Sequence, residues 1–213
     1  MKEISDSKFG VLKSPDSFEE LSDLIWNFRP GTDPFRARMW RGQSNIEWPI
    51  HSSAFRKLLL SHRMPKERDL QFYELDLLKH ATHRGYRRHD GRDLTDMELL
   101  AKLQHHGAAT RLVDATRNAF VALWFAISAD EDKTGILLGA HTSHLAGYEG
   151  EPEERKYEEI IKECVDNKNT FTWEPTSVTN RVAAQHSQFL YSSVGVFCRI
   201  THFRISPQVS SCE

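Results

Sequence analysis

The sequence predicts an α+β fold, in which N-terminal and central helices pack on a mainly antiparallel sheet as a single domain. Three observations support this fold class. Helical periodicity is concentrated in the first two thirds of the chain, short alternating segments follow in the last third, and no internal repeat is present. With 213 residues, of which 39% are hydrophobic, the chain is long enough to bury one core. We expect one domain over residues 1–213, with its core at roughly residues 17–203 and short loose tails.

The first predicted element is a helix over residues 16–28. Ser17 followed three positions later by Glu20 is the sequence pattern of a capping box, and Pro30-Gly31 ends the helix. The apolar positions of this segment fall on one helical face, as expected for a helix that covers a sheet: Leu21, Leu24, Ile25 and Phe28.

A strand is predicted over residues 37–41. Period-two alternation places Arg41 on the same face as Met39, and Trp40 and Gly42 on the opposite face. An arginine on an apolar face requires a partner, because an unpaired buried charge is costly. A polar, irregular connection follows the strand.

Two amphipathic helices are predicted in the middle of the chain. The first spans residues 67–83, with apolar side chains at helical spacing: Leu70, Tyr73, Leu77 and Ala81. The second runs to His106 and opens at a second capping box, Thr95 with Glu98. Gly107 is well placed as the left-handed residue that ends it.

Residues 119–129 form the most apolar segment of the sequence. A helix that is apolar on every face is expected to be buried, so this segment is predicted to be the central core element. Asp114 or Thr116 is expected to cap it.

The remaining elements are shorter. An acidic helix is predicted over residues 149–166 and a polar turn or short helix over residues 181–185. Alternation and turn signals predict strands over residues 135–139, 170–175, 188–192 and 195–203.

The composition excludes several protein classes. A net charge of −2 and a pI near 6.6 provide no global cationic field of the kind that drives non-specific DNA binding. No window approaches 18 consecutive apolar residues, and the first ten residues do not form a secretory signal. The three cysteines do not form a disulfide pattern. We therefore expect a cytoplasmic protein without a membrane span.

Polar side chains gather between the helix that ends at His106 and the apolar helix at residues 119–129. They are Gln104, His105, His106, Thr110, Arg111 and Asp114. Arg111 and Asp114 can pair on the turn while Asp114 caps the next helix. A zinc site that used these histidines would need a third ligand at a suitable spacing in the sequence. We find none, so we expect no metal site.

Three blocks of the sequence resemble the FRG domain family, which is named for an aromatic-Arg-Gly motif. The motif is present as Trp40-Arg41-Gly42-Gln43. The second block is Gln104-His105-His106-Gly107 followed by Thr110-Arg111-Leu112-Val113-Asp114-Ala115-Thr116. The third is Arg181-Val-Ala-Ala184-Gln185-His-Ser187-Gln-Phe189. His106, Ala115 and Ser187 replace an aromatic residue, a tryptophan and a glycine of the family pattern, so the shape of the pocket is expected to differ.

The aromatic-Arg-Gly strand is also similar to the first strand of ADP-ribosyltransferases, whose split sheet the chain is then expected to share. The resemblance implies an NAD-consuming transferase, of the kind found in toxins and phage-defence effectors, with a nucleic acid or protein acceptor and an antitoxin-like or regulatory partner. Arg41, Gln185 and Asp114 are the implied catalytic residues, and Glu174 is a further candidate for the acidic role. The residues expected to bind NAD are Trp40, Arg41, Gly42, Gln43, Gln104, His105, Thr110, Arg111 and Arg181.

Two other functions remain open. In one, the same residues bind a nucleotide, a nucleic acid or a protein without catalysis. In the other, the polar blocks only maintain the fold, with Arg41 in a salt bridge, for example to Asp114. The basic loop at residues 84–92 is a candidate nucleic-acid surface, because its arginines can contact phosphate while an aromatic ring stacks on a base: Arg84, Tyr86, Arg87 and Arg88.

Overall fold

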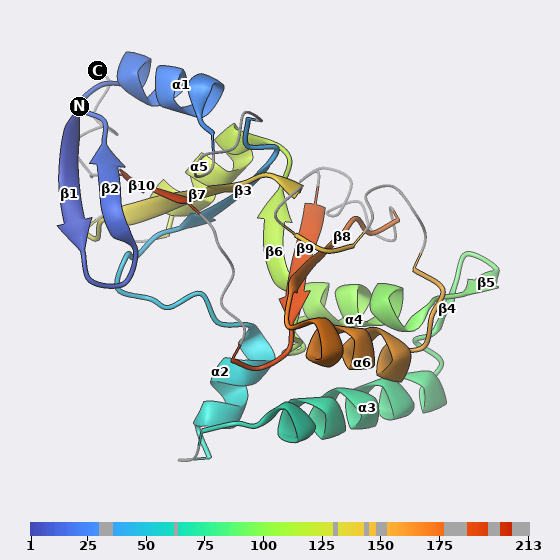
Figure 1. Cartoon of the computed structure of the whole chain (residues 1–213). Coiled ribbons are helices and arrows are strands. Elements are labelled where there is room, and N and C mark those ends of the chain that lie inside the picture. Colours follow the sequence, from blue (N-terminus) through green and yellow to red (C-terminus); the bar gives the residue numbers. More distant parts are fainter. Residues whose placement is uncertain are drawn as a thin grey trace. The chain divides into compact units, whose positions relative to one another are not determined.

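The computed structural model confirms the α+β fold class (Figure 1). It describes residues 1–29, 36–61, 64–129, 132–142, 145–147, 153–176, 187–195 and 201–205, the last segment by its backbone alone. By its contacts the chain divides into two compact units. The sheet unit comprises Met1–Ile50, Ala115–His144 and Arg199–Glu213, and the helical unit comprises His51–Asp114 and Leu145–Cys198. Each unit is described below by itself, and one domain over residues 1–213 stays a prediction.

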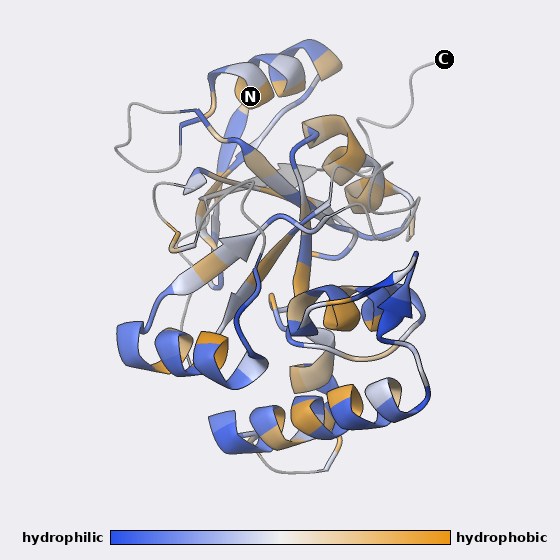
Figure 2. Ribbon diagram, turned by 90° about the vertical axis from the view of Figure 1, so that its right-hand side faces the viewer, coloured by the Kyte–Doolittle hydropathy of each residue, from blue (hydrophilic) through white to orange (hydrophobic). Residues whose placement is uncertain are grey.

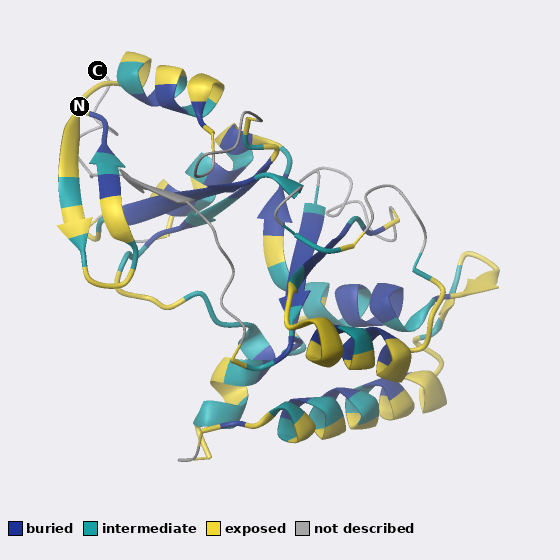
Figure 3. Ribbon diagram, viewed as in Figure 1, coloured by how far each residue is buried: buried dark blue, intermediate teal, exposed yellow. Residues whose placement is uncertain are grey.

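The sheet unit is built on strands in the order β1-β2-β10-β7-β3-β6. Neighbouring strands are antiparallel except for β10 and β2, which are parallel. The strands are β1 (Lys2–Asp6), β2 (Gly10–Ser14), β3 (Met39–Gln43), β6 (Val113–Thr116, of which the last two residues belong to this unit), β7 (Gly135–Ala140) and β10 (Thr201–Ile205). Every residue of β7 is buried (Figure 3), as expected for a strand in the interior of a sheet.

Two helices cover one face of this sheet, α1 (Phe18–Asn27) and α5 (Ala119–Ile127). Their core includes Leu21, Trp40 and Leu137. The approach of α5 to the sheet is unusually close, because an ideal Cβ built at Gly42 would lie 1.7 Å from the carbonyl oxygen of Ala122. The helix can reach the strand only because residue 42 has no side chain and the facing helix residues are alanines.

The prediction that α5 is buried on every side is wrong. Its small residues Ala119, Ala122 and Ala126 face the sheet, whereas Phe120 and Trp124 are 54% and 59% exposed. A segment that is apolar on every face does not indicate which face will pack against another element. The small side chains pack on the sheet because they allow the close backbone approach.

The helical unit contains four helices, a two-stranded hairpin and two longer strands among its described residues. The helices are α2 (Ser53–Leu59), α3 (Glu67–His83), α4 (Asp96–His105) and α6 (Tyr157–Asn167). The strands are β4 (Arg88–His89), β5 (Arg92–Asp93), β8 (Thr170–Trp173) and β9 (Ser187–Ser192), with β8 antiparallel to β9.

The core of the helical unit joins α3, α4, α6, β8 and β9. The predicted bounds of α3 are confirmed, but its buried face is rotated from the predicted one. Leu70 and Ala81 are buried as expected, whereas Glu74 and Leu78 are buried in place of Tyr73 and Leu77. A glutamate therefore occupies a core position of this helix.

The start and end of α4 follow the sequence signals. Thr95 Oγ1 accepts a hydrogen bond from the backbone N–H of Glu98, and the Glu98 carboxylate accepts one from the backbone N–H of Thr95. Gly107 has a φ of +90°, which a glycine adopts without steric cost. Both the capping box and the glycine stop are confirmed.

Several predicted elements differ in extent. The acidic helix begins at Tyr157 rather than at residue 149, and the strand predicted at residues 37–41 begins at Met39. The β1–β2 hairpin and α2 were not predicted, because their sequences carry few alternating or periodic apolar residues. The turn predicted at residues 181–185 lies outside the described residues.

Among the described residues, no helix combines the length and the apolar character needed to cross a lipid bilayer.

Candidate functional site

The first motif lies on β3, between β7 on one side and β6 on the other. Trp40 is 4% exposed and packs on Phe28, with 5.8 Å between the ring centroids. Gly42 faces α5. Arg41 lies between them in the strand, opposite Leu138 of β7, so the alternation predicted from the sequence is confirmed and Arg41 points to the other face of the sheet. It is half-buried there.

Gln43 stabilises the turn that follows β3. Its side-chain nitrogen Nε2 donates hydrogen bonds to the carbonyl oxygens of Asn45 at 3.0 Å and Trp48 at 2.6 Å. The side chain is 6% exposed. The polar end of the motif is therefore used to shape the chain that leaves the strand.

In the helical unit, Gln104 connects the two parts of the second motif. Its Nε2 donates to Asp114 Oδ1 at 2.8 Å, and its Oε1 accepts a hydrogen bond from the Thr110 hydroxyl. Thr110 is fully buried, and its backbone N–H donates to the hydroxyl of Ser53 at the start of α2. The structure thus brings together three of the predicted site residues: Gln104, Thr110 and Asp114.

Arg111 is enclosed in the helical unit at 2% exposure. Its Nε donates to Glu74 Oε2 at 2.6 Å, and its backbone N–H donates to Oε1 of the same carboxylate at 2.6 Å. Its remaining guanidinium nitrogens donate to Glu67, to the carbonyl oxygen of Ser192 and to the Tyr157 hydroxyl. The Tyr157 hydroxyl in turn donates to Glu74 Oε2 at 2.6 Å. We call these side chains, Arg111, Glu74, Glu67 and Tyr157, the Arg111 network.

Charge balance explains how these groups remain buried. Burial alone would lower the pKa of Arg111, but the neighbouring Glu74, Tyr157 and Glu67 outweigh it and raise the pKa, so the guanidinium stays charged. Burial, followed by the charge of Glu74, raises the pKa of the Tyr157 hydroxyl, which therefore keeps its proton. The network joins α3, α6 and the end of β9 through one cation.

Sequence reasoning missed the partners of Arg111. The expected pair with Asp114 is wrong, since the guanidinium is occupied by Glu74 and Glu67. One signal could have indicated the true partner: Glu74 lies four positions from both Leu70 and Leu78, inside an apolar helical stripe. A carboxylate at such a position requires a buried cation.

Asp114 does not cap the helix that follows it. Asn118 is the N-cap of α5, and its Oδ1 accepts from the backbone N–H groups of Phe120 and Val121 at 3.0 and 3.4 Å. Thr116 instead accepts from the Asn118 N–H at 3.1 Å, one step before the cap. Asp114 is exposed and bound to Gln104, so its carboxylate remains accessible to solvent.

The two histidines of the second motif have different surroundings. The His105 ring makes an edge contact with Phe189 at 6.4 Å between centroids, and His106 is exposed. Among the described residues, no group of three or more His, Cys, Asp or Glu side chains is arranged to hold a metal ion.

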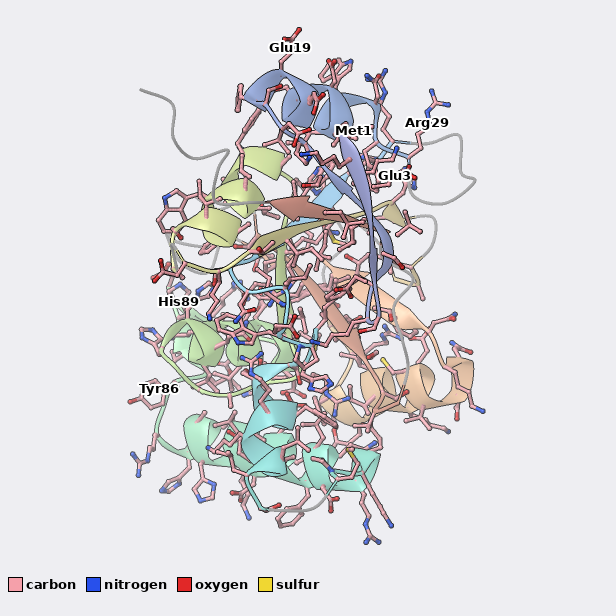
Figure 4. All side chains as sticks on the ribbon, turned by 90° about the vertical axis from the view of Figure 1, so that its left-hand side faces the viewer. Met1, Glu3, Glu19, Arg29, Tyr86 and His89 are labelled. Carbon is pink, nitrogen blue, oxygen red and sulfur yellow. The ribbon has the colours of Figure 1, made fainter. Side chains whose placement is uncertain are left out.

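The basic loop is largely organised by its own salt bridges. Arg87 donates to Thr82, to the carbonyl oxygen of Leu94 and to Asp96, the last at 2.6 Å. Its side chain thus fixes the loop. Tyr86 is 49% exposed and lies at the outer edge of the ribbon (Figure 4). Arg84 is also exposed, and Arg88 forms only an exposed ion pair with Asp93.

Arg92 is the last arginine of the same loop, whose arginines were predicted to contact nucleic-acid phosphate. It forms two hydrogen bonds of 2.7 Å with the buried carboxylate of Glu98. Burial of Glu98 acts to raise its pKa, but hydrogen bonds from Arg92, Thr176 and Thr95 outweigh burial and lower the pKa to about 2. This pair connects the hairpin to the capping box of α4.

The third motif is only partly described. Arg181 and Gln185 lie outside the described residues, and Phe189 is fully buried in β9. Glu174 follows β8 and is half-buried. The meeting of Arg41 with Gln104, Asp114 and Gln185 in one pocket stays a prediction, as does the salt bridge between Arg41 and Asp114.

Comparison with known proteins identifies one family. The model of the FRG domain matches residues 36–135, just under half of the chain, and includes the first and second motifs. No curated protein and no solved structure matches the chain. The third motif lies beyond the matched range. The chain therefore carries an FRG domain, at residues 36–135.

Proposed function

We propose that this FRG-domain chain is an NAD-consuming ADP-ribosyltransferase-like enzyme in which Arg41 binds the diphosphate. The observation that carries the proposal is the position of Arg41. It is the one charged residue of β3, it is half-buried, and it lies on the sheet face opposite α5. The guanidinium fork suits a diphosphate, and a half-buried setting strengthens such a contact.

The neighbours of Arg41 support this role by contrast. Trp40 and Gly42 are explained by packing, the first against Phe28 and the second against α5. Gln43 is explained by its hydrogen bonds to the following turn. These contacts account for the three neighbours of Arg41 by packing and by turn formation, and a guanidinium in the middle of them has the geometry that suits a diphosphate.

The chemistry of the proposed reaction defines what the site must supply. The glycosidic bond between the ribose and nicotinamide breaks, nicotinamide leaves with the bonding electrons, and an acceptor oxygen or nitrogen bonds to the anomeric carbon and loses its proton. Positive charge develops on the ribose, so a carboxylate or carbonyl oxygen beside it is required. Asp114, Glu174 and Gln185 are the candidates, and Asp114 is held in place by Gln104.

The first test is NAD turnover by Arg41→Ala. With labelled NAD and a panel of protein and nucleic-acid acceptors, we expect the wild-type chain to release nicotinamide and transfer label. We expect Arg41→Ala to lose about 30-fold or more in kcat/KM, because removing one member of a charged contact costs roughly 2–5 kcal/mol. Arg41→Lys should fall between them, since it keeps the charge but not the fork.

Arg38→Ala is the matched control, because Arg38 is an exposed arginine just before the same strand. It should retain wild-type activity, and circular dichroism should show all variants folded. Absence of nicotinamide release from the wild-type chain with every acceptor would contradict catalysis. An unfolded Arg41→Ala variant would instead assign Arg41 to the maintenance of the fold.

A non-catalytic nucleic-acid-binding module is the second candidate, favoured by the basic loop. Arg87 and Arg92 are committed to Asp96 and Glu98, and they hold Arg84, Tyr86 and Arg88 at the surface. An exposed ring beside cations is the arrangement that binds single-stranded nucleic acid, through stacking and phosphate contacts.

We expect Tyr86→Ala to weaken binding of a fluorescent single-stranded oligonucleotide by roughly 5- to 150-fold, the range given by about 1–3 kcal/mol per stacked base. Arg84→Ala should weaken binding and make it less dependent on salt. Arg68→Ala, an exposed arginine near the start of α3, is the control. Anisotropy titrations at two salt concentrations measure both effects. Equal affinities for Tyr86→Ala and Arg68→Ala would exclude this surface.

A further inference from the structure

A pocket of about 450 Å³ lies in the sheet unit beside α1 and β2. Its α1 wall is formed by residues at positions i, i+3, i+4, i+7 and i+8, which share one face of a helix: Glu20, Asp23, Leu24, Asn27 and Phe28. Figure 2 shows that α1 carries both hydrophobic and hydrophilic residues. The volume lies within the range of about 300–1,000 Å³ that is usual for small-molecule sites.

Two cations of the pocket wall lack a partner in the part of the chain that the structure describes. The side chains of Lys13, on β2, and of Arg29, just after the end of α1, form no ion pair and no hydrogen bond with any described residue. Glu3 lies opposite Lys13 in the register of β1 and β2, but these two described side chains form no ion pair. Lys13 is half-buried and Arg29 is exposed, so Lys13 belongs to the wall and Arg29 to the rim.

The pocket also offers one carboxylate and one amide. Asp23 and Asn27 form no side-chain hydrogen bond or ion pair with the residues that the structure describes. Glu20 differs from them, because its carboxylate accepts from the Met1 ammonium at 2.8 Å and from the Asp16 N–H at 2.9 Å. The charges that the described residues leave without a partner in the pocket are therefore two positive and one negative.

We propose that this pocket binds a small organic anion that has an apolar body and carries a hydrogen-bond donor. The anionic group, a carboxylate or a phosphate, pairs with Lys13 and Arg29, because ionised partners form the strongest hydrogen bonds. The donor faces the carboxylate of Asp23. The apolar body rests on Leu24 and Phe28, which belong to the core of the sheet unit and are 9% and 8% exposed.

The shape of the wall distinguishes these cations from ordinary surface cations. A lysine on a flat surface is fully solvated, and an ion pair formed there contributes little. In a concave site with an apolar floor, part of the water is excluded, which strengthens an ionic contact. The pocket therefore favours a ligand that supplies charge and apolar surface together.

The pocket is separate from the proposed NAD site. Phe28 packs on Trp40, so the α1 face of the sheet is the face to which Trp40 points. Arg41 is the next residue of the strand and points to the opposite face. Ligand binding in the pocket and NAD turnover at Arg41 are thus independent, and the two proposals succeed or fail separately.

NMR titrations of the isotope-labelled chain with benzoate, phenyl phosphate and benzylamine test the proposal. We expect both anions to shift the backbone signals of Lys13 and of residues 20–29, and the tighter of the two identifies the preferred anionic group. Benzylamine has the same ring with the opposite charge. It should bind at least about 10-fold more weakly, which is the usual contribution of a hydrogen bond between charged groups.

Two variants of the cations give the expected losses. Lys13→Gln should weaken benzoate binding by about 10-fold, because glutamine keeps most of the length of the side chain but not its charge. Arg29→Ala should weaken it by roughly 2- to 5-fold, since its contact is exposed. Lys133→Ala is the matched control, because Lys133 is an exposed cation of the same unit that does not line the pocket. It should bind like the wild type.

The donor is tested with para-aminobenzoate, which adds an amino group to benzoate. We expect it to bind more tightly than benzoate to the wild-type chain, and we expect Asp23→Ala to remove that preference. The spectra of the unbound variants show whether each is folded. Signals of α1 that do not move with either anion, or equal affinities of Lys13→Gln, Arg29→Ala and Lys133→Ala, overturn the proposal. Benzylamine that binds as tightly as benzoate also overturns it.

Discussion

Arg111→Met is expected to lower the free energy of unfolding by about 3–5 kcal/mol, because it leaves a buried carboxylate without its cation. Glu74 is completely buried, and Arg111 donates to both of its oxygens. Methionine approximates the length of the side chain but supplies no charge and no donor. A total stability of about 5–15 kcal/mol is usual for a domain, so the loss should be visible as a large shift in the urea midpoint.

Arg155→Met is the matched control for this prediction. Arg155 forms ion pairs with Glu153 and Glu163, both at 2.6 Å, but its side chain is 44% exposed. Solvent screens such pairs, and we expect a change of less than about 1 kcal/mol. Similar urea midpoints for the two variants would show that burial does not increase the contribution of the Arg111 network to the free energy of unfolding. Combining Arg111→Met with Glu74→Leu should recover part of the loss, since the double variant has no unpaired carboxylate at position 74.

Gly42→Ala is expected to destabilise the chain by roughly 3 kcal/mol. The added methyl would lie 1.7 Å from the Ala122 carbonyl oxygen and 2.8 Å from the Ala126 backbone nitrogen, so α5 must move away from β3. Both groups that it meets belong to the backbone and cannot rotate aside. The shift of the urea midpoint measures the effect.

Gly107→Ala separates this steric effect from the loss of a glycine in general. A Cβ at Gly107 meets nothing within 4 Å, but the residue has a φ of +90°, so only backbone strain of about 1–2 kcal/mol is expected. Gly42→Ala should therefore be clearly the less stable variant. The reverse order would mean that α5 adjusts its distance from the sheet at little cost. The comparison also bears on the aromatic-Arg-Gly motif. If Gly42 is required for the packing of α5 on β3, its presence in the motif does not by itself indicate ligand binding.

The local features of the fold were predictable because they depend on neighbours in the sequence. The bounds of α3, the Thr95–Glu98 capping box and the alternation around Arg41 are examples. The extent to which α5 is buried was not predictable, because it depends on which face of the helix packs on the sheet in the tertiary structure. An all-apolar sequence is equally compatible with a helix that is buried on every side and with a helix that is buried on one side only.

In the candidate site, too, the contacts between residues close in the sequence were predictable, and those set by tertiary structure were not. The motifs identified Gln104, Thr110 and Asp114 as neighbours in the sequence, and the structure connects them through hydrogen bonds of the Gln104 side chain. The partners of Arg111 could not be read from the motif, because Glu74 and Tyr157 are supplied by α3 and α6. A pairing set by tertiary structure leaves only an indirect mark in the sequence, here a glutamate within an apolar stripe.

The wide sequence spacing of the Arg111 network bears on synthesis by the ribosome. Arg111 contacts Glu74 across 37 residues and Tyr157 across 46 residues. Because Tyr157 is translated after Glu67, Glu74 and Arg111, the buried guanidinium and the Glu74 carboxylate each lack a hydrogen-bond partner until α6 has emerged. Long loops must close before the network is complete, which slows folding. The helical unit is therefore expected to reach its final packing only when most of the chain has been translated, and chaperones have the longest access to it during that interval.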